Sequence, residues 1–199
     1  GAMVYYILAI SALLVLFALL MYPVASMVGR IPLGWLTRAV LPAQVVALGS
    51  SSSLASLPAL IEGSRALGLP IPIGGFVLPF SVSTFKVATP IYWLIGILFL
   101  AKLYGVALGT GVLLSVAFMA VVLSLTIPGV PQGAVLLLAP VAVQYGIPAE
   151  GVALLLAADT IPDLFATMTN VTGDFVAATV VARRVVAEVA SPAASSADA

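Results

Sequence analysis

The longest apolar stretch, VYYILAISALLVLFALLMYPVASMVG at residues 4–29, carries no charged residue. Because a helix rises 1.5 Å per residue, about 20 such residues cross a bilayer core of roughly 30 Å. The stretch therefore predicts a plain transmembrane helix over residues 3–29. The whole chain is 63% hydrophobic and 7% charged, which lies outside the range of soluble domains. Together these features predict an all-α membrane protein.

The composition also limits the chemistry of the chain. Lys plus Arg and Asp plus Glu number seven each, so no charge surplus suggests a nucleic-acid partner. The absence of His and Cys excludes thiol and Ser-His-Asp catalysis and most transition-metal sites. Intramembrane aspartyl proteolysis needs carboxylates from different elements, whereas three aspartates here share one segment. We therefore expect neither an enzyme nor a cofactor. Gly1 and Ala2 are interpreted as a tag scar, and residues 191–199 as a disordered tail.

Two pairs of short apolar arms predict re-entrant hairpins in the membrane. In residues 31–68 the arms flank a run of four serines, and in residues 107–147 they flank the tip TIPGVPQG. Each arm is too short to cross a bilayer, and non-helical backbone at membrane depth must be surrounded by protein or a watery cavity.

A longer, interrupted apolar segment follows each hairpin, over residues 72–104 and residues 149–185. The order hairpin, broken span, hairpin, broken span predicts an inverted repeat. Such repeats are typical of secondary transporters with a site near the middle of the membrane.

Positive charges indicate the orientation of these segments. If the two hairpins enter from opposite sides, five arginines share one side: Arg30, Arg38, Arg65, Arg183 and Arg184. Lys102 falls on the other side. The positive-inside rule then places the arginines and the C-terminus in the cytoplasm.

The segment ADTIPDLFATMTNVTGD contains polar residues three or four positions apart: Asp159, Asp163, Thr167, Asn170 and Asp174. This spacing places them on one face of a helix. The face could simply line water or lie at a span end, but buried carboxylates in a membrane are functional by default. Pro162 cannot donate to the carbonyl of Ala158, so a kink is expected at the proline.

The two hairpin tips carry complementary groups. Hydroxyls and free amides in the run 50–53 could receive an anion at a helix N-terminus, although a serine run could equally cap that helix. The tip PGVPQG cannot form a regular helix, which leaves backbone amides and carbonyls available.

The serine run, the GVP tip and above all the motif TMTNVTGD resemble the dicarboxylate/amino acid:cation symporter family of glutamate-transporter homologues. The similarity extends over about residues 4–185 and corresponds to the C-terminal half of a typical member: span 6, hairpin 1, span 7, hairpin 2 and span 8. The earlier spans, which supply the scaffold in the family, are not in this chain.

The resemblance implies roles for individual residues. Asp163 would hold the substrate ammonium, Thr167 and Asn170 would contact the substrate, and Thr89 matches a threonine after the unwound part of span 7. The substrate carboxylate would lie between the two tips, at Ser51, Ser52, Ser53 and the region of Val130. The Asp174 carboxylate and the Asn170 carbonyl would belong to a sodium site.

Three departures from the family pattern bear on these roles. Phe85 and Val87 replace the Asn and Asp that help to hold sodium. Ala166 replaces the arginine that pairs with an acidic substrate side chain, so we expect a neutral amino acid to bind better than aspartate. Lys86 is new, and it lies in the middle of a predicted span.

A cation at that depth needs a partner, unless it extends to a water-filled cavity. We expect the Lys86 ammonium to take the space of a sodium ion near Asp174 and Asn170. This substitution predicts sodium independence and makes proton coupling through Lys86 a hypothesis, with sodium at Asn170 and Asp174 as the alternative.

These observations predict an elevator-type, symporter-like transporter for a small amino acid or carboxylate. Its partners would be the solute, the lipid bilayer, and either a homo-oligomer or a separate scaffold subunit. A bacterial or archaeal inner membrane is the expected location. A non-transporting ligand-binding or structural subunit, or a truncated fragment of a full-length symporter, remains the alternative.

Overall fold

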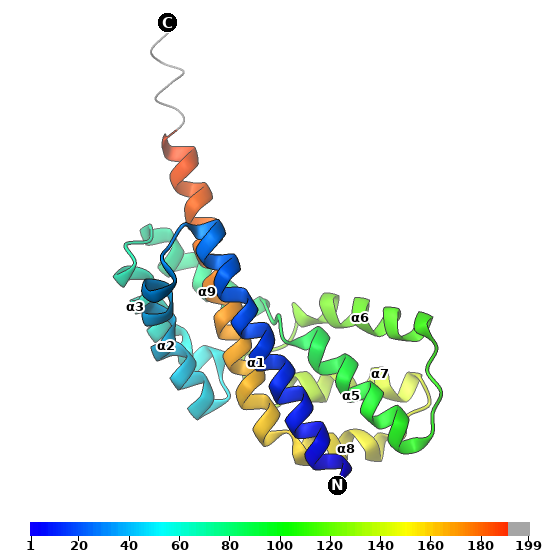
Figure 1. Ribbon diagram of the computed structural model, residues 1–199. Helices are drawn as coiled ribbons and strands as arrows, with labels where there is room; N and C mark the ends of the chain where they lie inside the picture. The colour runs from blue at the N-terminus through cyan, green and yellow to red at the C-terminus, as the bar shows by residue number, and fades with distance from the viewer. Residues whose placement is uncertain (191–199) are drawn as a thin grey trace, which may run out of the picture.

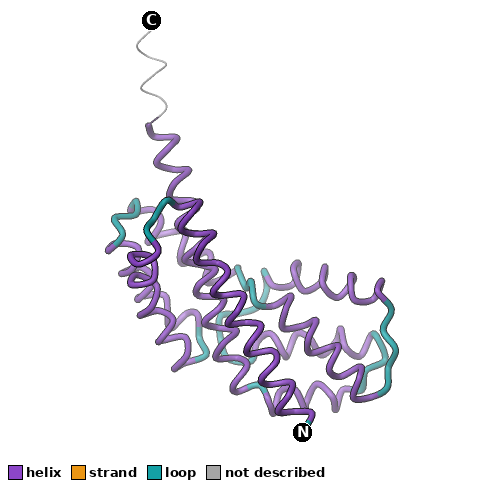
Figure 2. The backbone as a smooth tube through the Cα atoms, viewed as in Figure 1, coloured by secondary structure: helices purple, strands orange, loops and turns teal. Residues whose placement is uncertain are grey.

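The structure is a computed structural model that describes residues 1–190, and this part of the chain is helical with no strand (Figure 2). Three of its helical segments are long and apolar enough to cross a membrane: Ala2–Gly29, Ile73–Tyr104 and Thr160–Val186. The predicted all-α class is confirmed. The predicted tail, residues 191–199, lies outside the described residues.

Two long helices, α1 (Ala2–Gly29) and α9 (Thr160–Ala190), run side by side through the middle of the molecule (Figure 1). They are parallel, because the Thr169 hydroxyl donates to the Leu14 carbonyl (3.0 Å) and Arg183 donates to the Val28 carbonyl (2.6 Å). One face of α1 is buried against its neighbours, while the opposite face exposes large apolar side chains suited to lipid.

The first pair of short helices is α2 (Leu33–Ser50) and α3 (Ser53–Ala66), joined by a tight turn at Ser51 with φ 49°. The helices approach closely at Gly63, where a Cβ atom would lie 2.2 Å from the Ala39 carbonyl oxygen. Ser52 caps α3, since its hydroxyl accepts from the Ala55 amide at 3.2 Å. These helices occupy the segment for which the first hairpin is expected.

A broken segment follows, made of the π-helical turn η1 (Ile73–Val77), α4 (Leu78–Thr84) and α5 (Thr89–Tyr104). Helix α4 ends where Phe85 adopts an extended conformation, φ −109° and ψ 106°. Pro90 has no amide hydrogen for the carbonyl of Lys86, which disfavours an uninterrupted helix through this point. The π-helical turn was not predicted from the sequence.

The second pair is α6 (Thr110–Ser124) and α7 (Gly133–Gln144), with a non-helical tip between them. The chain continues through α8 (Ala149–Ala158) into α9. The expected kink at Pro162 lies three residues earlier, because α8 ends at Ala158 and α9 begins at Thr160. The proline still explains the position, since the carbonyl of Ala158 cannot be paired by an amide at residue 162.

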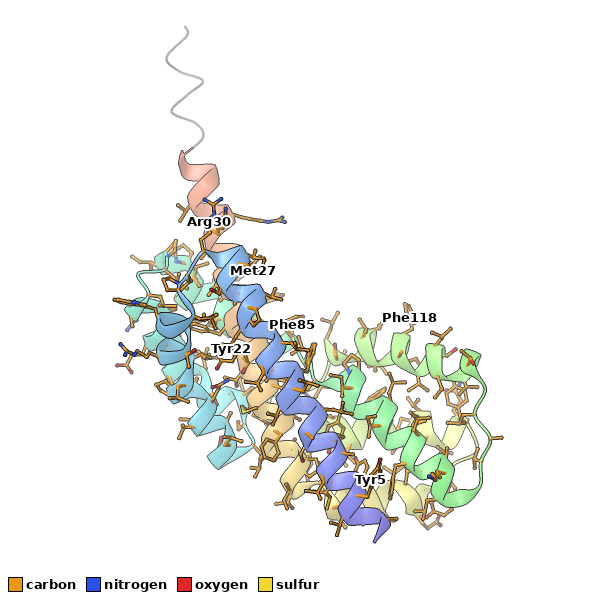
Figure 3. All side chains as sticks on the ribbon, viewed as in Figure 1. Tyr5, Tyr22, Met27, Arg30, Phe85 and Phe118 are labelled. Atoms are coloured by element: carbon orange, nitrogen blue, oxygen red, sulfur yellow. The ribbon has the colours of Figure 1, made fainter. Side chains whose placement is uncertain are left out.

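Positive side chains gather at one end of the central pair. Arg30 ends α1 there (Figure 3), and Arg183 and Arg184 surround the same region beside Val28. Lys102 lies beside Gly1 and Tyr5 at the opposite end of α1. The separation agrees with the charge asymmetry of the sequence.

Two apolar clusters hold the fold together. One joins the first half of α1 to α5–α8, and the other joins α2, α3 and α4 to the second half of α9. The break between α4 and α5 lies at their boundary, since Val82 belongs to one cluster and Ala88 to the other. The polar site described next is therefore anchored on both sides by packed apolar side chains.

Candidate functional site

The two non-helical tips touch each other. The Ser52 hydroxyl and the Leu54 amide both donate to the Gly129 carbonyl, at 3.0 and 3.5 Å. Gly129 is closely approached, since a Cβ atom there would lie 3.2 Å from Leu54 and 3.4 Å from the Val82 carbonyl. The tips therefore meet beside the break that follows α4.

A cavity of ≈ 30 Å³ lies behind this contact. It is lined by seven of the predicted substrate residues: Ser51, Ser53, Thr89, Val130, Asp163, Thr167 and Asn170. Lys86 also lines it. Such a volume holds about one or two waters, so a larger ligand requires the walls to separate. Val130 is 47% exposed at the rim of the cavity and belongs to the non-helical tip between α6 and α7.

Two predicted residues do not line the cavity. Ser52 contributes indirectly, through the cap of α3 and its bond to Gly129. Asp174 lies deeper, and its Oδ1 accepts from the Ser81 hydroxyl at 2.6 Å. Ser81 was missed from the sequence, because one serine in an apolar segment gives no signal of a partner in α9.

Asp163 connects α9 to the second tip. Its Oδ2 accepts from the Gln132 amide at 3.0 Å, and Gln132 adopts a left-handed conformation, φ 62°. The Gln132 side chain donates to the Leu156 carbonyl at 3.3 Å. The sequence predicted free amides in this tip, but it could not indicate that Gln132 supplies the one that reaches Asp163.

Asn170 connects α9 to the break. Its Oδ1 accepts from the Ala88 amide at 2.9 Å, which holds the start of α5 against α9. Thr89, the first residue of α5, and Thr167 are both buried beside it. The cavity thus has carboxylate, amide and hydroxyl groups fixed by four different parts of the chain.

Lys86 is buried in the break, with 3% of its surface exposed. Its ammonium donates to the Val82 carbonyl at the end of α4, and the Asp174 charge acts on it without a direct ion pair between the two groups. Asp174 is fully buried, and its Oδ2 has no hydrogen-bond partner. The lysine therefore supplies positive charge where a buried carboxylate needs it.

The side chains at residues 85 and 87 supply no oxygen ligand for a sodium ion. Sodium takes oxygen ligands, but Phe85 is directed outward at 37% exposure and Val87 packs against Gly173. A Cβ atom at Gly173 would lie 2.6 Å from a Val87 methyl group. Within residues 1–190, no group of three or more His, Cys, Asp or Glu could hold a metal.

The predicted polar stripe is divided in the structure. Asp163, Thr167 and Asn170 face the cavity, whereas Asp174 faces α4. Asp159 precedes α9 and is 1% exposed, and neither of its carboxylate oxygens has a hydrogen-bond partner. All five residues are buried, so the stripe contacts protein along its length.

The apolar helices indicate an integral membrane protein, and paired short helices, two broken helices and a polar site between them are typical of secondary transporters. A family model described as the sodium:dicarboxylate symporter family matches residues 1–184, and the chain belongs to that family. The resemblance predicted from the motifs is confirmed. The family consists of transporters, in agreement with the expectation that the chain is not an enzyme.

Several curated proteins are similar to the chain. Excitatory amino acid transporter 4 of Rattus norvegicus is 33% identical over 143 residues, which cover 71% of this chain and 26% of that protein. The proton/glutamate-aspartate symporter of Escherichia coli (strain K12) is 29% identical over 177 residues, covering 89% and 40%. The C4-dicarboxylate transport protein of Sphingopyxis alaskensis is 36% identical over 139 residues, covering 69% and 31%. The chain thus matches between about a quarter and two-fifths of these relatives.

Proposed function

We propose that the chain is the ligand-binding, moving part of a secondary active transporter for a small amino acid or carboxylate. The observation that carries this proposal is the cavity, where seven residues expected to bind substrate converge from both tips, the α4–α5 break and α9. Asp163 would hold the ammonium group. The hydroxyls of Ser51 and Ser53, beside the N-terminus of α3, would receive the carboxylate.

Ligand entry would require the second tip to move. Few bonds hold it: the contacts of Gly129 with Ser52 and Leu54, and the contacts of Gln132 with Asp163 and with the Leu156 carbonyl. An incoming ammonium would attract the Asp163 carboxylate that now accepts from Gln132, so binding and closure of the tip would be coupled.

Transport would then proceed by an elevator-like movement of this unit against a scaffold. A homo-oligomer or a separate scaffold subunit would provide that surface. The relatives whose names specify glutamate, aspartate or C4-dicarboxylates support the solute class. The alternative is a ligand-binding or structural unit that does not transport by itself, or a fragment of a full-length symporter.

Coupling would be independent of sodium and would use a proton on Lys86. The supporting observations are the buried ammonium near Asp174 and the apolar side chains at residues 85 and 87. Protonated Lys86 would compensate Asp174, and loss of the proton would leave that carboxylate without its cation. A symporter named for both proton and sodium occurs among the relatives, in Bacillus subtilis (strain 168).

The proposed location is a bacterial or archaeal inner membrane with the arginine-rich end of α1 and α9 in the cytoplasm. The gathering of Arg30, Arg183 and Arg184 at one end, with Lys102 at the other, supports this orientation.

Reconstitution of the full chain into liposomes tests the proposal. Saturable uptake of labelled L-alanine is expected, equal in sodium and choline buffers, and lost in Asp163→Asn. Glu62→Gln, at an exposed position in α3, is the matched control and should retain uptake. Binding without uptake would support the non-transporting alternative, and absence of both would contradict the proposal.

A further inference from the structure

Two buried carboxylates lie one helical turn apart behind the second tip. The Asp163 amide donates to the Asp159 carbonyl at 2.9 Å, which is the backbone hydrogen bond of one helical turn. Residues four positions apart on a helix have Cβ atoms about 5–6 Å apart. Asp163 is 9% exposed and accepts a hydrogen bond from the Gln132 amide. Asp159 is 1% exposed, and its carboxylate accepts no hydrogen bond. Burial of an ionised carboxylate without compensation is strongly unfavourable.

Buried hydroxyls without a hydrogen-bond partner form a second, independent observation. Tyr92 lines the cavity, is 1% exposed, and its hydroxyl has no hydrogen-bond partner. Tyr6 is also buried with an unpartnered hydroxyl. A buried tyrosine hydroxyl usually has a partner. The pattern indicates a polar subsite next to the cavity.

Ala166 lines the cavity and is three residues after Asp163 and seven after Asp159, which places all three on one side of the helix. A long side chain at this position would point back toward the N-terminus of α9, where Asp159 lies. Alanine provides no donor, so the carboxylate can be compensated by a group that the ligand carries.

We propose that this subsite receives the cationic side chain of a basic amino acid such as ornithine. The α-ammonium would lie on Asp163 and the side-chain ammonium on Asp159, with the Tyr92 hydroxyl beside it. A short methylene chain bridges two carboxylates one turn apart. The inference rests on the proposed binding site and specifies its ligand class, with basic amino acids preferred to neutral ones.

Calorimetric titration of the purified full chain tests this preference. Ornithine and norvaline share their carbon chain, and only ornithine carries the terminal ammonium. We expect ornithine to bind about tenfold or more tightly than norvaline, since a charge-assisted bond is added. Asp159→Asn should remove that advantage, while Glu62→Gln should preserve both affinities.

A reciprocal variant separates ligand recognition from a structural role. Ala166→Arg would direct a guanidinium toward Asp159, so ornithine should bind at least tenfold more weakly and aspartate more tightly. Loss of packing alone would weaken both ligands.

Four outcomes would overturn the inference. Equal binding of norvaline and ornithine to the unmodified chain shows that Asp159 meets no ligand cation, and this comparison is decisive even where a variant fails to fold. If ornithine still binds more tightly than norvaline in Asp159→Asn, a group other than Asp159 recognises the side-chain ammonium. Binding of alanine without an ornithine preference overturns the inference alone, whereas binding of no amino acid overturns the proposed function with it.

Discussion

At the residue scale, the charges of Lys86 and Asp174 depend on each other. Lys86 lies in the break after α4. Asp174 belongs to α9, where one of its carboxylate oxygens accepts a hydrogen bond from the Ser81 hydroxyl and the other has no hydrogen-bond partner. Removal of one member of a buried charge pair leaves the other uncompensated, which costs more than removal of both. The pair therefore predicts strong energetic coupling between two positions far apart in the sequence.

Lys86→Met should destabilise the folded protein by about 3–5 kcal/mol, because it leaves the Asp174 carboxylate buried without a cation. Asp174→Asn in the same chain should restore part of that loss. Denaturant unfolding in detergent of the two single variants and the double variant measures the coupling. Additive effects would show that the two side chains do not compensate each other.

Transport by the same variant tests the role of Lys86 in coupling. In the unmodified chain we expect uptake that responds to pH and is equal in sodium and choline, because the tethered ammonium replaces a bound ion. Lys86→Met should abolish the response to pH. Liposome uptake measured at several pH values checks this. Steep sodium dependence in the unmodified chain, unchanged in Lys86→Met, would show that Lys86 takes no part in coupling.

At the scale of the elements, each tip depends on the helices that present it. The Ser52 and Leu54 groups that meet Gly129 lie at the start of α3, and α3 is held against α2 where Gly63 passes the Ala39 carbonyl. A side chain at residue 63 would separate α2 from α3 and displace the first tip.

Gly63→Ala should lower the free energy of unfolding by about 1–3 kcal/mol, and with it the melting temperature, because the added methyl group collides with the Ala39 backbone. Gly49→Ala in α2 is the control, since a Cβ atom there meets nothing within 4 Å and alanine favours the helix. Melting curves of the two variants in the same detergent provide the comparison. Similar melting temperatures would contradict the close approach of α2 and α3.

Much of this arrangement could be predicted from the sequence, because hydropathy and helix breakers report local preferences. Arms too short to span a membrane indicated the paired helices, and the spacing around Asp163 and Asn170 indicated the polar face. Pairing at long range could not be read in this way. Nothing local distinguishes Ser81 as a partner of Asp174, or Gln132 as the donor to Asp163. The division of the stripe depends on which neighbour each turn of α9 meets.

At the scale of the whole molecule, the site lies between two packed clusters that share α9. The outer faces are apolar: Phe118 projects outward from α6 (Figure 3) and is 71% exposed, and Leu8 and Leu16 of α1 are also exposed. Lipid or a scaffold would cover these faces. The central claim is that an amino acid binds between the tips, at the boundary of the two clusters.

Protection of a single cysteine by ligand tests that claim most directly, because the chain has no cysteine of its own. Val130→Cys places a thiol at the exposed rim of the cavity, and Gly109→Cys places one at an exposed position before α6. Both variants are treated with a maleimide at increasing concentrations of L-alanine. The predicted result is that L-alanine slows labelling at residue 130 in a saturable manner and leaves residue 109 unaffected. Unchanged labelling at residue 130, while L-alanine binds with a measurable affinity, would contradict the claim.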